Sequence, residues 1–363
     1  MTTEDNPPSI GRRRRQPTHK PKVRLEEVAQ EAGVSAATVS RVLNNPSLVT
    51  KELRDKVLKA TKKLGYVADG AARALASRRS RALGAVVPNL SNTIFSDMIE
   101  GFQQRIEPQG YTMLLATFEY DEGAEYRSVR TMIERGVDGL VLVGVTRSKE
   151  LEALLKNSGI PFVQTWAPAR ASEYPTIGYD NATAARLLID HLVGLGHRDI
   201  GVVAGLTQHN DRVRARLAGL RAAMRRHRLP LPADRIVYTE YRIAKAREAF
   251  RALQSKGELP TALIANNDIV ALGLMIEAQS QGIRVPSQLS IVGVGDLEIS
   301  AHVKPPLTTV RSPKFAIGAM AADYLLARVN GRDYAIPDEL PLELVVRGST
   351  APPRTPRRKD PSS

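Results

Sequence analysis

The chain has 363 residues, of which 42% are hydrophobic, and it carries a formal net charge of +14 with no cysteine. This length predicts two or three domains with ample cores, and the lack of cysteine excludes disulfides and thiolate chemistry. No apolar run approaches the roughly 18 residues that a membrane-spanning helix needs. Arg12–Arg15 precede no apolar segment, so they do not form a secretory signal, and we expect a cytoplasmic protein.

The basic excess lies at the two ends of the sequence. Residues 1–24 carry 7 Lys and Arg against 2 Asp and Glu, residues 25–80 carry 10 against 6, and residues 351–363 carry 4 against 1. Residues 81–350 are nearly neutral, with 31 against 29. This distribution predicts a polyanion as the partner of the amino-terminal part and a different ligand for the middle. We expect 1–24 and 348–363 to be disordered basic segments.

Segment 25–66 has the pattern of a three-helix DNA-binding domain. Apolar residues recur at helical spacing on both sides of Gly33, which tolerates a left-handed turn, and Ser35 and Thr50 are suited to cap the helices that follow. Two short helices joined by a tight turn form a helix-turn-helix, although an ordinary helical hairpin shows the same local pattern. The residues left for the outer face of the second helix are Ala36, Ala37, Thr38, Ser40, Arg41 and Asn44.

Segment 67–80 is an alanine-rich linker that is too short to form a stable helix alone. It can order when DNA and a partner chain are present, which makes it a candidate hinge helix. Leu75 is its one large apolar side chain before residue 80, apart from Val67 at its start. Spacing alone leaves two roles open for Leu75, a wedge between base steps in a minor groove or a packing contact with the next domain.

Segment 81–347 alternates short apolar strands with amphipathic helices. Such alternation is typical of parallel sheets covered on both faces, and its two series predict two doubly wound lobes with a ligand cleft between them. The helix after Tyr179 is marked by Asp180 or Asn181 at its start and Gly196 at its end. The predicted strands cover residues 82–87, 111–116, 139–143 and 160–165 in the first series, and 200–204, 261–265 and 289–294 in the second.

The loops that follow the predicted strands carry polar and aromatic residues suited to a small ligand. Ligands of such sheets bind beyond the carboxyl ends of the strands. Planar groups such as guanidinium and amide pair neighbouring hydroxyls, and beside aromatic rings they suit a polyhydroxylated molecule. For Asn266 helix capping is an equally good explanation. The candidates from these loops are Asn92, Phe95, Trp166, Arg214, Arg216, Tyr241, Asn266, Asn267 and Asp268.

Residues 23–350 resemble the lactose/galactose repressor (LacI/GalR) family from end to end. The motifs that carry the resemblance are VAQEAGVSAATVSRVLN at 28–44, KVLKATKKLGY at 56–66, DNATAARLLIDHLVGLGH at 180–197, RARLAGL at 214–220, NNDIVALGLM at 266–275 and PPLTTV at 305–310. The resemblance implies an amino-terminal helix-turn-helix headpiece with a hinge helix, and a two-lobed core like that of periplasmic binding proteins, with the chain crossing between the lobes. It also implies a homodimer that binds a palindromic operator and responds to a sugar-like effector.

The same resemblance implies roles for individual residues. Ala36 and Ala37 fall at the base-specifying positions of the recognition helix, and Leu75 takes the place of the intercalating hinge leucine. Ser35, Thr38, Ser40, Arg41 and Asn44 belong to the same DNA-contacting set. Effector positions fall on Arg216, Asn267 and Asp296 or its neighbours, and residues that line the pocket in other members fall on Asn92, Phe95, Trp166 and Tyr241.

Two departures from the family pattern bear on function. Many members have Pro and Asn before the hinge helix, where this chain has Ala68 and Asp69. After the last core strand the family commonly has an aromatic residue and two aspartates, where this chain has Val294, Gly295 and Asp296. Loss of one carboxylate favours an acidic sugar that Arg216 could pair. Segment 88–103 is likewise similar to the gluconate-type repressors, so we expect gluconate or a related acid.

Other classes of function fit the sequence less well. A sugar-binding protein of the periplasm shares the two-lobed fold but would not carry residues 1–80. A regulator that responds to a non-sugar metabolite such as a nucleobase remains an alternative. We expect no enzyme, catalytic residue, metal or cofactor, because the sequence has no nucleophile elbow and its 6 His residues are scattered. No leucine heptad follows Arg347, so we expect a dimer, with Ile99–Ile106 as one candidate for the interface.

Overall fold

The computed structural model describes residues 23–44, 48–67, 79–90 and 93–354. These residues belong to two units, one up to Ser80 and one from Arg81 onward. Four of the predictions concern residues wholly or largely outside the described part of the chain: the basic arm, the hinge with Leu75, the effector contact Asn92, and the tail from residue 355 onward.

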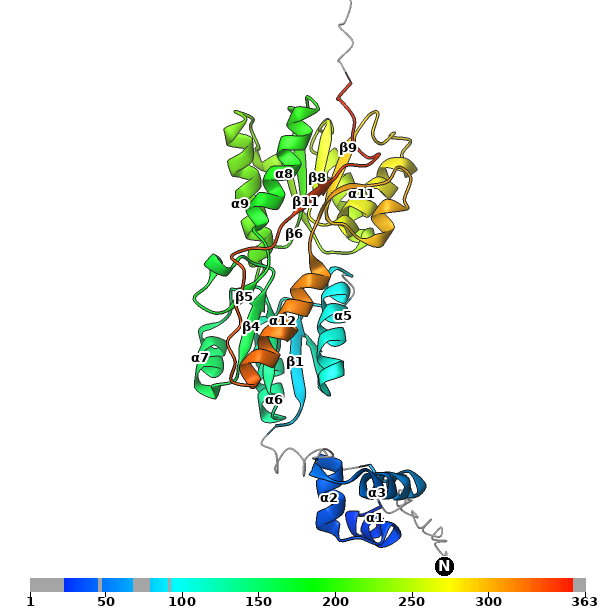
Figure 1. The fold of residues 1–363 in the computed structure, drawn as a ribbon. Coiled ribbons are helices and arrows are strands. Elements are labelled where there is room, and N and C mark those ends of the chain that lie inside the picture. The colour runs from blue at the N-terminus through cyan, green and yellow to red at the C-terminus, as the bar shows by residue number, and fades with distance from the viewer. Residues whose placement is uncertain (1–22, 45–47, 68–78, 91–92, 355–363) are drawn as a thin grey trace, which may run out of the picture. The chain divides into compact units, whose positions relative to one another are not determined.

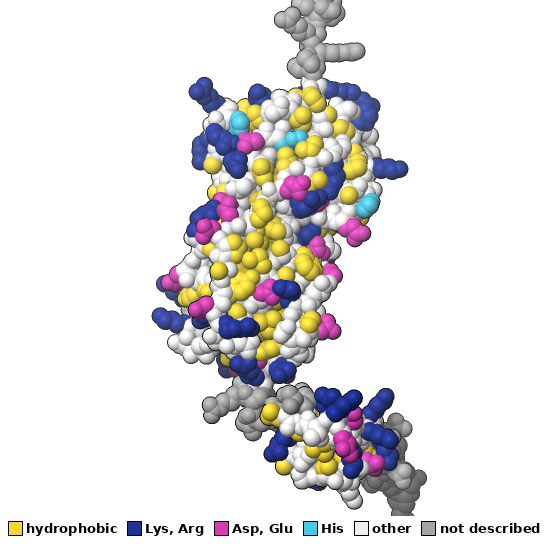
Figure 2. Space-filling view, in the orientation of Figure 1, with side chains coloured by type: hydrophobic (Ala, Val, Ile, Leu, Met, Phe, Trp, Pro, Cys, Tyr) yellow, Lys and Arg dark blue, Asp and Glu magenta, His cyan; other side chains and the backbone are white. Residues whose placement is uncertain are grey.

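The first unit is the predicted helix-turn-helix with a third helix (Figure 1). Its helices are α1 (Leu25–Ala32), α2 (Ala36–Asn44) and α3 (Lys51–Leu64). Gly33 adopts the left-handed conformation with φ of 63°, which lets the chain turn sharply between α1 and α2. Val28, Val39 and Val57 are fully buried and join the three helices in one small core. Figure 2 shows Lys and Arg side chains gathered on this unit.

The first lobe of the second unit is built on a five-stranded parallel sheet. Its strands are β1 (Ala82–Val87), β2 (Thr112–Thr117), β3 (Gly139–Val143), β4 (Phe162–Thr165) and β5 (Thr176–Ile177), in the spatial order β2-β1-β3-β4-β5. The helices that pack with them are α5 (Ile94–Ile106), α6 (Glu122–Glu134), α7 (Lys149–Ser158) and α12 (Lys314–Val329). Because β1 lies between β2 and β3 and is covered on both faces, its burial is nearly continuous, as expected for a parallel sheet.

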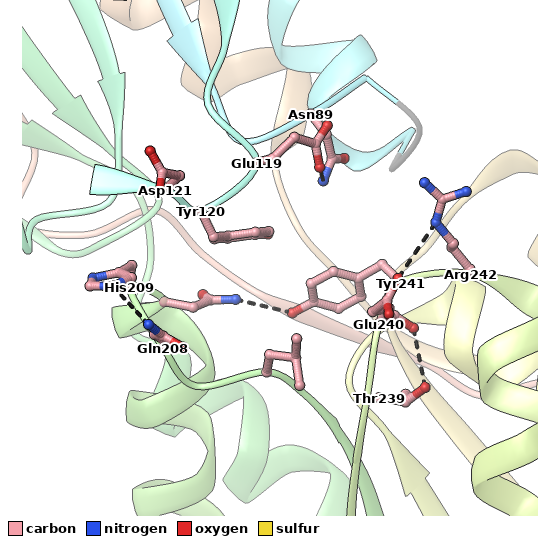
Figure 3. Close-up of a pocket in the computed structure, with 12 residues that line it drawn as sticks. Asn89, Glu119, Tyr120, Asp121, Gln208, His209, Thr239, Glu240, Tyr241 and Arg242 are labelled. Carbon is pink, nitrogen blue, oxygen red and sulfur yellow. Dashed lines mark hydrogen bonds and ion pairs between the residues drawn. The ribbon is translucent and has the colours of Figure 1, made fainter. Parts of the chain in front are cut away.

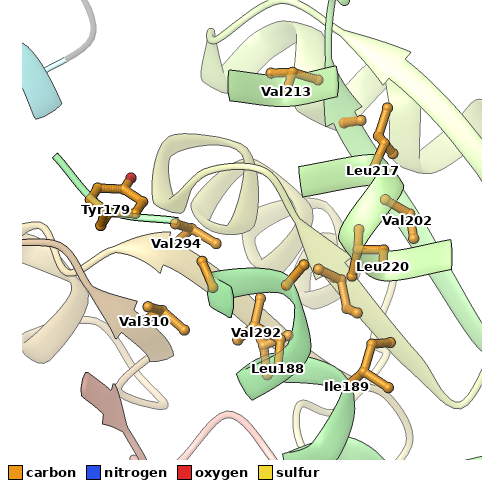
Figure 4. Packing of buried hydrophobic residues seen from close by; sticks show 14 of the residues in the cluster. Tyr179, Leu188, Ile189, Val202, Val213, Leu217, Leu220, Val292, Val294 and Val310 are labelled. Atoms are coloured by element: carbon orange, nitrogen blue, oxygen red, sulfur yellow. The ribbon is translucent and has the colours of Figure 1, made fainter. Parts of the chain in front are cut away.

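The second lobe has a six-stranded sheet in the order β11-β10-β9-β8-β6-β7. Only β11 is antiparallel among these strands. The strands are β6 (Ile200–Gly205), β7 (Ile236–Thr239), β8 (Ala262–Ala265), β9 (Ser290–Gly295), β10 (Thr308–Arg311) and β11 (Glu343–Val345), and the helices are α8 (Asn181–Gly194), α9 (Asp211–Arg226), α10 (Ile243–Gln254) and α11 (Asp268–Ser280). Figure 4 shows the core of this lobe, where Leu188 and Leu220 from the helices pack near Val202 and Val292 from the sheet.

The chain crosses between the lobes three times, between β5 and α8, between β10 and α12, and between α12 and β11 (Figure 1). The second crossing brings α12 back to the first lobe, where it packs closely along α5. Gly318 makes this approach possible, because a Cβ there would lie 1.8 Å from the backbone oxygen of Met98. Much of the Ile99–Ile106 stripe, including Phe102, is therefore buried in the core of the lobe rather than free for a dimer interface.

The sequence-based prediction was incomplete for the strands and wrong for part of the carboxyl-terminal tail. It missed β5, β7, β10 and β11, which have two to four residues each. Residues 348–354 were expected to be disordered, but the hydroxyl of Ser349 is fully buried and accepts a hydrogen bond from the Thr308 amide at 2.8 Å. Within the described residues, no helix combines the length and the apolar character that crossing a bilayer requires.

Candidate functional site

The exposed face of α2 carries the candidate DNA contacts. Ala37 and Arg41 are exposed, and Thr38 and Ser40 are half-buried. Asn44 ends the helix, but its side chain lies outside the described part of the structure. The Ser35 hydroxyl accepts a hydrogen bond from the Thr38 amide at 3.1 Å and lies 2.8 Å from the Thr38 hydroxyl, so it caps α2 as predicted.

Ala36 differs from the expectation that it lies on the outer face. It is half-buried and packs against the three-helix core. The reason is its position, since residues three and seven ahead, Val39 and Leu43, belong to the inner stripe of the same helix. Ala37 is therefore the better placed of the two predicted base-specifying alanines.

A small cavity between the two lobes, here called the inner chamber, contains most of the predicted effector residues. It lies at the carboxyl ends of the strands, as the fold class predicts, and has a volume of about 20 Å³. The structure brings together five predicted residues, which come from both lobes, with five others. The lining residues are Ile94, Phe95, Tyr120, Trp166, Tyr179, Arg212, Arg216, Tyr241, Asn267 and Val294.

Aromatic rings form one wall of the inner chamber. Trp166 packs edge-on against Phe95 and against Tyr179, with ring centroids 5.4 Å and 6.2 Å apart. Its indole nitrogen lies 3.0 Å from the sulfur of Met98. Burial raises the pKa of the Tyr179 phenol, so this hydroxyl remains neutral and can donate a hydrogen bond to a ligand.

Arg216 supplies an uncompensated positive charge to the inner chamber. Its side chain is only 7% exposed, and its Nη1 donates to Asn181 Oδ1, which is neutral. Asn181 in turn donates to the backbone oxygen of Trp166 at 3.0 Å, which fixes its orientation. No carboxylate of the described residues forms an ion pair with Arg216, and its Nε has no hydrogen-bond partner there. A buried guanidinium in this state is costly unless a ligand brings an anion.

Arg212 is a second buried guanidinium, one turn before Arg216 on α9. Its Nη1 lies 2.7 Å from Asp211 Oδ1, and its Nη2 has no acceptor in hydrogen-bonding geometry among the described residues. Burial opposes ionisation of Asp211, but the charges of Arg212 and Arg147 and the hydrogen bond from the Val145 amide together outweigh it and lower the pKa of that carboxyl. Asp211 also accepts a hydrogen bond from the Val145 amide of the other lobe at 2.7 Å, so this ion pair lies at the junction of the lobes.

A larger cavity, here called the outer chamber, adjoins the inner chamber and has a volume of about 400 Å³, within the range of small-molecule sites (Figure 3). Tyr120 and Tyr241 line both chambers, with ring centroids 6.4 Å apart, so they separate the two. Asn210 donates to the Tyr241 hydroxyl at 3.4 Å. The remaining lining residues are Asn89, Glu119, Asp121, Leu206, Gln208, His209, Thr239, Glu240 and Arg242.

Backbone strain is concentrated around these chambers. Glu119, Tyr120, Trp166 and His209 all have positive φ, between 46° and 70°, although none is glycine. Non-glycine residues rarely adopt this conformation, and bulky aromatic ones do so least. The surrounding fold therefore holds these side chains in place against a local cost, which is typical of ligand-binding sites.

Asp296 is the predicted effector residue that the structure does not bring to either chamber. Its backbone has φ of 52°, and its carboxylate pairs with Arg311 Nε at 2.7 Å and Arg347 Nη2 at 2.6 Å. Burial opposes ionisation of Asp296, but the hydrogen bonds and the charges of the two arginines together outweigh it and lower the pKa of this carboxyl. Its acceptor capacity is therefore used within the second lobe. Asn267, by contrast, is the N-cap residue of α11, and its side chain makes no capping hydrogen bond.

Sequence reasoning missed Tyr120, Tyr179, Asn181 and Arg212. Arg212 could have been found, because residues four apart on a helix lie on one face and Arg216 was already a candidate. Tyr120 had no such signal, since its place depends on two successive positive φ values in the loop after β2. Arg214, which the sequence offered equally, is exposed and donates to Thr146 Oγ1 at 3.1 Å.

Comparison with known proteins supports the architecture and the function. The model of the lacI family of bacterial regulatory proteins matches residues 24–69, and that of the periplasmic binding protein-like domain matches residues 189–350. The transcriptional regulator GntR of Pseudomonas aeruginosa (strain PAO1) is 33% identical over 90% of this chain and 95% of its own. The HTH-type transcriptional repressor PurR of Vibrio parahaemolyticus is 32% identical over 85% of this chain and 93% of its own.

Among solved structures, the lac repressor dimer bound to operator and the anti-inducer ONPF aligns with a TM-score of 0.81. The alignment covers 91% of this chain and 99% of that chain at 28% sequence identity. The match therefore spans the helix-turn-helix unit and both lobes. The chain belongs to the LacI family and is a DNA-binding transcriptional regulator with an effector-binding core.

Proposed function

We propose that this regulator is a homodimeric repressor of sugar-acid utilisation genes, controlled by gluconate or a closely related acid bound between the lobes. The single observation that carries this proposal is Arg216, a guanidinium that is 7% exposed and has no carboxylate partner among the described residues. A monovalent acid would neutralise this charge through a charge-assisted hydrogen bond to its free Nε. The similarity to GntR of P. aeruginosa points in the same direction.

The mechanism is a coupling free energy between the effector site and the operator site. Arg212 and Arg216 belong to the second lobe, and Phe95, Tyr120 and Trp166 to the first, so a ligand that contacts both sets changes how the lobes sit together. In a dimer bound to a palindromic operator, such a change alters the spacing of the two recognition helices. A coupling of ~1–3 kcal/mol changes operator affinity by about 5–150-fold.

A nucleobase effector is the second candidate, because the repressor PurR is a relative of similar identity. The inner chamber argues against it. Its two guanidinium groups present donors only, and a neutral base would leave the charge of Arg216 without compensation.

Thermal unfolding with candidate effectors tests this proposal. At a concentration 100-fold above Kd, a ligand that binds only the folded state stabilises it by about 2.7 kcal/mol. We expect gluconate to raise the melting temperature by roughly 5 °C or more, at about 2 °C per kcal/mol for a core of this size. Glucose and hypoxanthine, at the same concentration, should leave it within 1 °C or so of the free protein. A shift with hypoxanthine or glucose but not with gluconate would contradict the proposal.

A further inference from the structure

The two chambers differ in charge, and this difference restricts which effector can bind across both of them. The inner chamber has two buried guanidinium groups and lies beside one carboxylate, that of Asp211. The outer chamber is lined by three carboxylates and one guanidinium, those of Glu119, Asp121, Glu240 and Arg242. A ligand that spans both therefore meets a positive field at one end and a negative field at the other.

The volume of the inner chamber limits what can enter it. At about 20 Å³ it has room for a group about as large as a water molecule. A carboxylate head fits this description approximately, whereas the body of a sugar does not. The body must then lie in the outer chamber of about 400 Å³, beyond the rings of Tyr120 and Tyr241.

The carboxylates of the outer chamber have limited cationic compensation. Among the described residues, Glu119 accepts from the neutral amide of Asn89 at 3.5 Å and forms no ion pair. Asp121 caps α6 by accepting from the Ala124 amide at 2.5 Å, and its one cationic neighbour there is Arg127 at 3.8 Å, in a pair that is exposed to solvent. The guanidinium of Arg242 lies 3.7 Å from Glu240, and both side chains are exposed. Figure 3 shows Glu119 and Asp121 on one side of the two tyrosine rings and His209 on another.

A fourth carboxylate, that of Glu122, lies beside His209 at the edge of the outer chamber. The Nδ1 of His209 lies 2.7 Å from Glu122 Oε1, and its Nε2 lies 3.2 Å from the amide of Gln208. The outer chamber is consequently rich in acceptors for hydroxyl groups and unfavourable for an anion.

From this asymmetry we infer that the effector is a sugar acid with a single charge, held with its carboxylate in the inner chamber and its hydroxyl groups in the outer chamber. The inference rests on the proposed function and adds to it a rule for which sugar acids bind. Acids with a second anionic group at the far end, such as aldarates or phosphorylated aldonates, are rejected, because that group would lie among Glu119, Asp121 and Glu240. Neutral polyols are rejected at the other end, because they would leave the buried charge of Arg216 without compensation.

A matched set of three ligands tests the rule by isothermal titration calorimetry on the full chain. D-Glucarate differs from D-gluconate only in a carboxylate at C6, and D-glucitol differs only in a hydroxymethyl group at C1. We expect glucarate to bind at least 30-fold more weakly than gluconate and glucitol at least 100-fold more weakly. Equal or tighter binding of glucarate would overturn the rule but leave the sugar-acid effector standing. Equal binding of glucitol, or no binding of gluconate, would overturn the proposed function itself.

Variants of the outer chamber test whether its carboxylates cause the selection of gluconate over glucarate. In the double variant Glu119→Gln and Glu240→Gln, the ratio of the glucarate Kd to the gluconate Kd should fall about tenfold, whatever the change in gluconate affinity alone. Glu248→Gln is the matched control, because Glu248 is exposed on α10, pairs with Lys245 at 2.9 Å and lies outside both chambers. A ratio that stays the same in the double variant, or that falls equally in the control, would contradict the assignment.

Discussion

Replacing Arg216 with methionine should abolish the response to a sugar acid and leave operator binding intact. Methionine keeps much of the side-chain volume and removes the guanidinium that faces the inner chamber. Loss of one partner from a buried, hydrogen-bonded charge pair costs about 2–5 kcal/mol of binding free energy. A loss of about 3 kcal/mol corresponds to a roughly 150-fold higher Kd for gluconate.

The same variant should not destabilise the free protein. Arg216 has no carboxylate partner among the described residues, so its removal relieves a desolvation cost that offsets the loss of its hydrogen bond to Asn181. We therefore expect the free energy of unfolding, measured without ligand in urea, to stay constant or to rise. Unfolding of the variant under conditions where the wild type is folded would show that Arg216 serves the structure instead.

Arg214→Met is the matched control on the same helix. Arg214 is exposed and donates to Thr207 O at 2.8 Å and to Thr146 Oγ1, outside both chambers. This variant should retain the gluconate affinity of the wild type within a factor of about three. If Arg216→Met bound gluconate as well as Arg214→Met does, Arg216 would have no place in the effector site.

Replacing Arg147 with methionine should destabilise the core by about 3–5 kcal/mol at pH 7.5. Arg147 and Glu125 form a buried ion pair at 3.4 Å, with side chains 1% and 5% exposed. Burial raises the pKa of Glu125 although Arg147 opposes it, so without Arg147 the carboxylate is both buried and uncompensated. Urea denaturation of the variant measures the loss.

The stability deficit of Arg147→Met should depend on pH, in a direction that follows from the raised pKa of Glu125. A carboxyl whose pKa is raised in the folded state binds its proton more tightly there than in the unfolded chain, so its contribution to stability is lost as pH rises through the folded pKa. The deficit of Arg147→Met should therefore shrink when the pH falls from 7.5 to 5. The double variant Glu125→Leu and Arg147→Met should recover the wild-type stability or exceed it, because no buried charge of the pair remains.

Arg130→Met is a control that removes an arginine from an exposed ion pair instead of a buried one. Arg130 pairs with Glu134 at 2.8 Å, but both side chains are more than half exposed, so solvent screens the interaction. Its loss should cost at most about 1 kcal/mol. A deficit of the same size in Arg147→Met, or one that does not change with pH, would contradict the account of the buried pair.

The long, strongly patterned elements could be predicted from the sequence, and the short ones could not. The central strands β1, β3 and β9 are continuous apolar runs between amphipathic helices, which makes both the sheets and the cleft between them predictable. β5 and β11 have two and three residues, too few for any periodicity. Their place depends on neighbours that are distant in the sequence, since β11 pairs with β10.

The residues of the effector site could be predicted where a side chain suited to a ligand lies at a position that the fold or the family pattern marks for ligand contact. Phe95, Trp166, Arg216, Tyr241 and Asn267 follow predicted strands or lie in the motifs of the family, and the structure brings them together. Asp296 follows a predicted strand as well, but two arginines that the sequence could not place beside it take up its carboxylate. The charge of the outer chamber depends on loops whose conformations have no local signal.

In the proposed mechanism, a sugar acid bound between the lobes controls the affinity of the amino-terminal unit for its operator. Fluorescence anisotropy with the full chain and an operator duplex selected by this protein from random sequence tests it most directly. The account predicts that saturating gluconate changes operator affinity by about 5–150-fold and that Arg216→Met abolishes the change. Equal affinity for the operator and for an unrelated duplex, or an operator affinity that gluconate leaves unchanged, would contradict it.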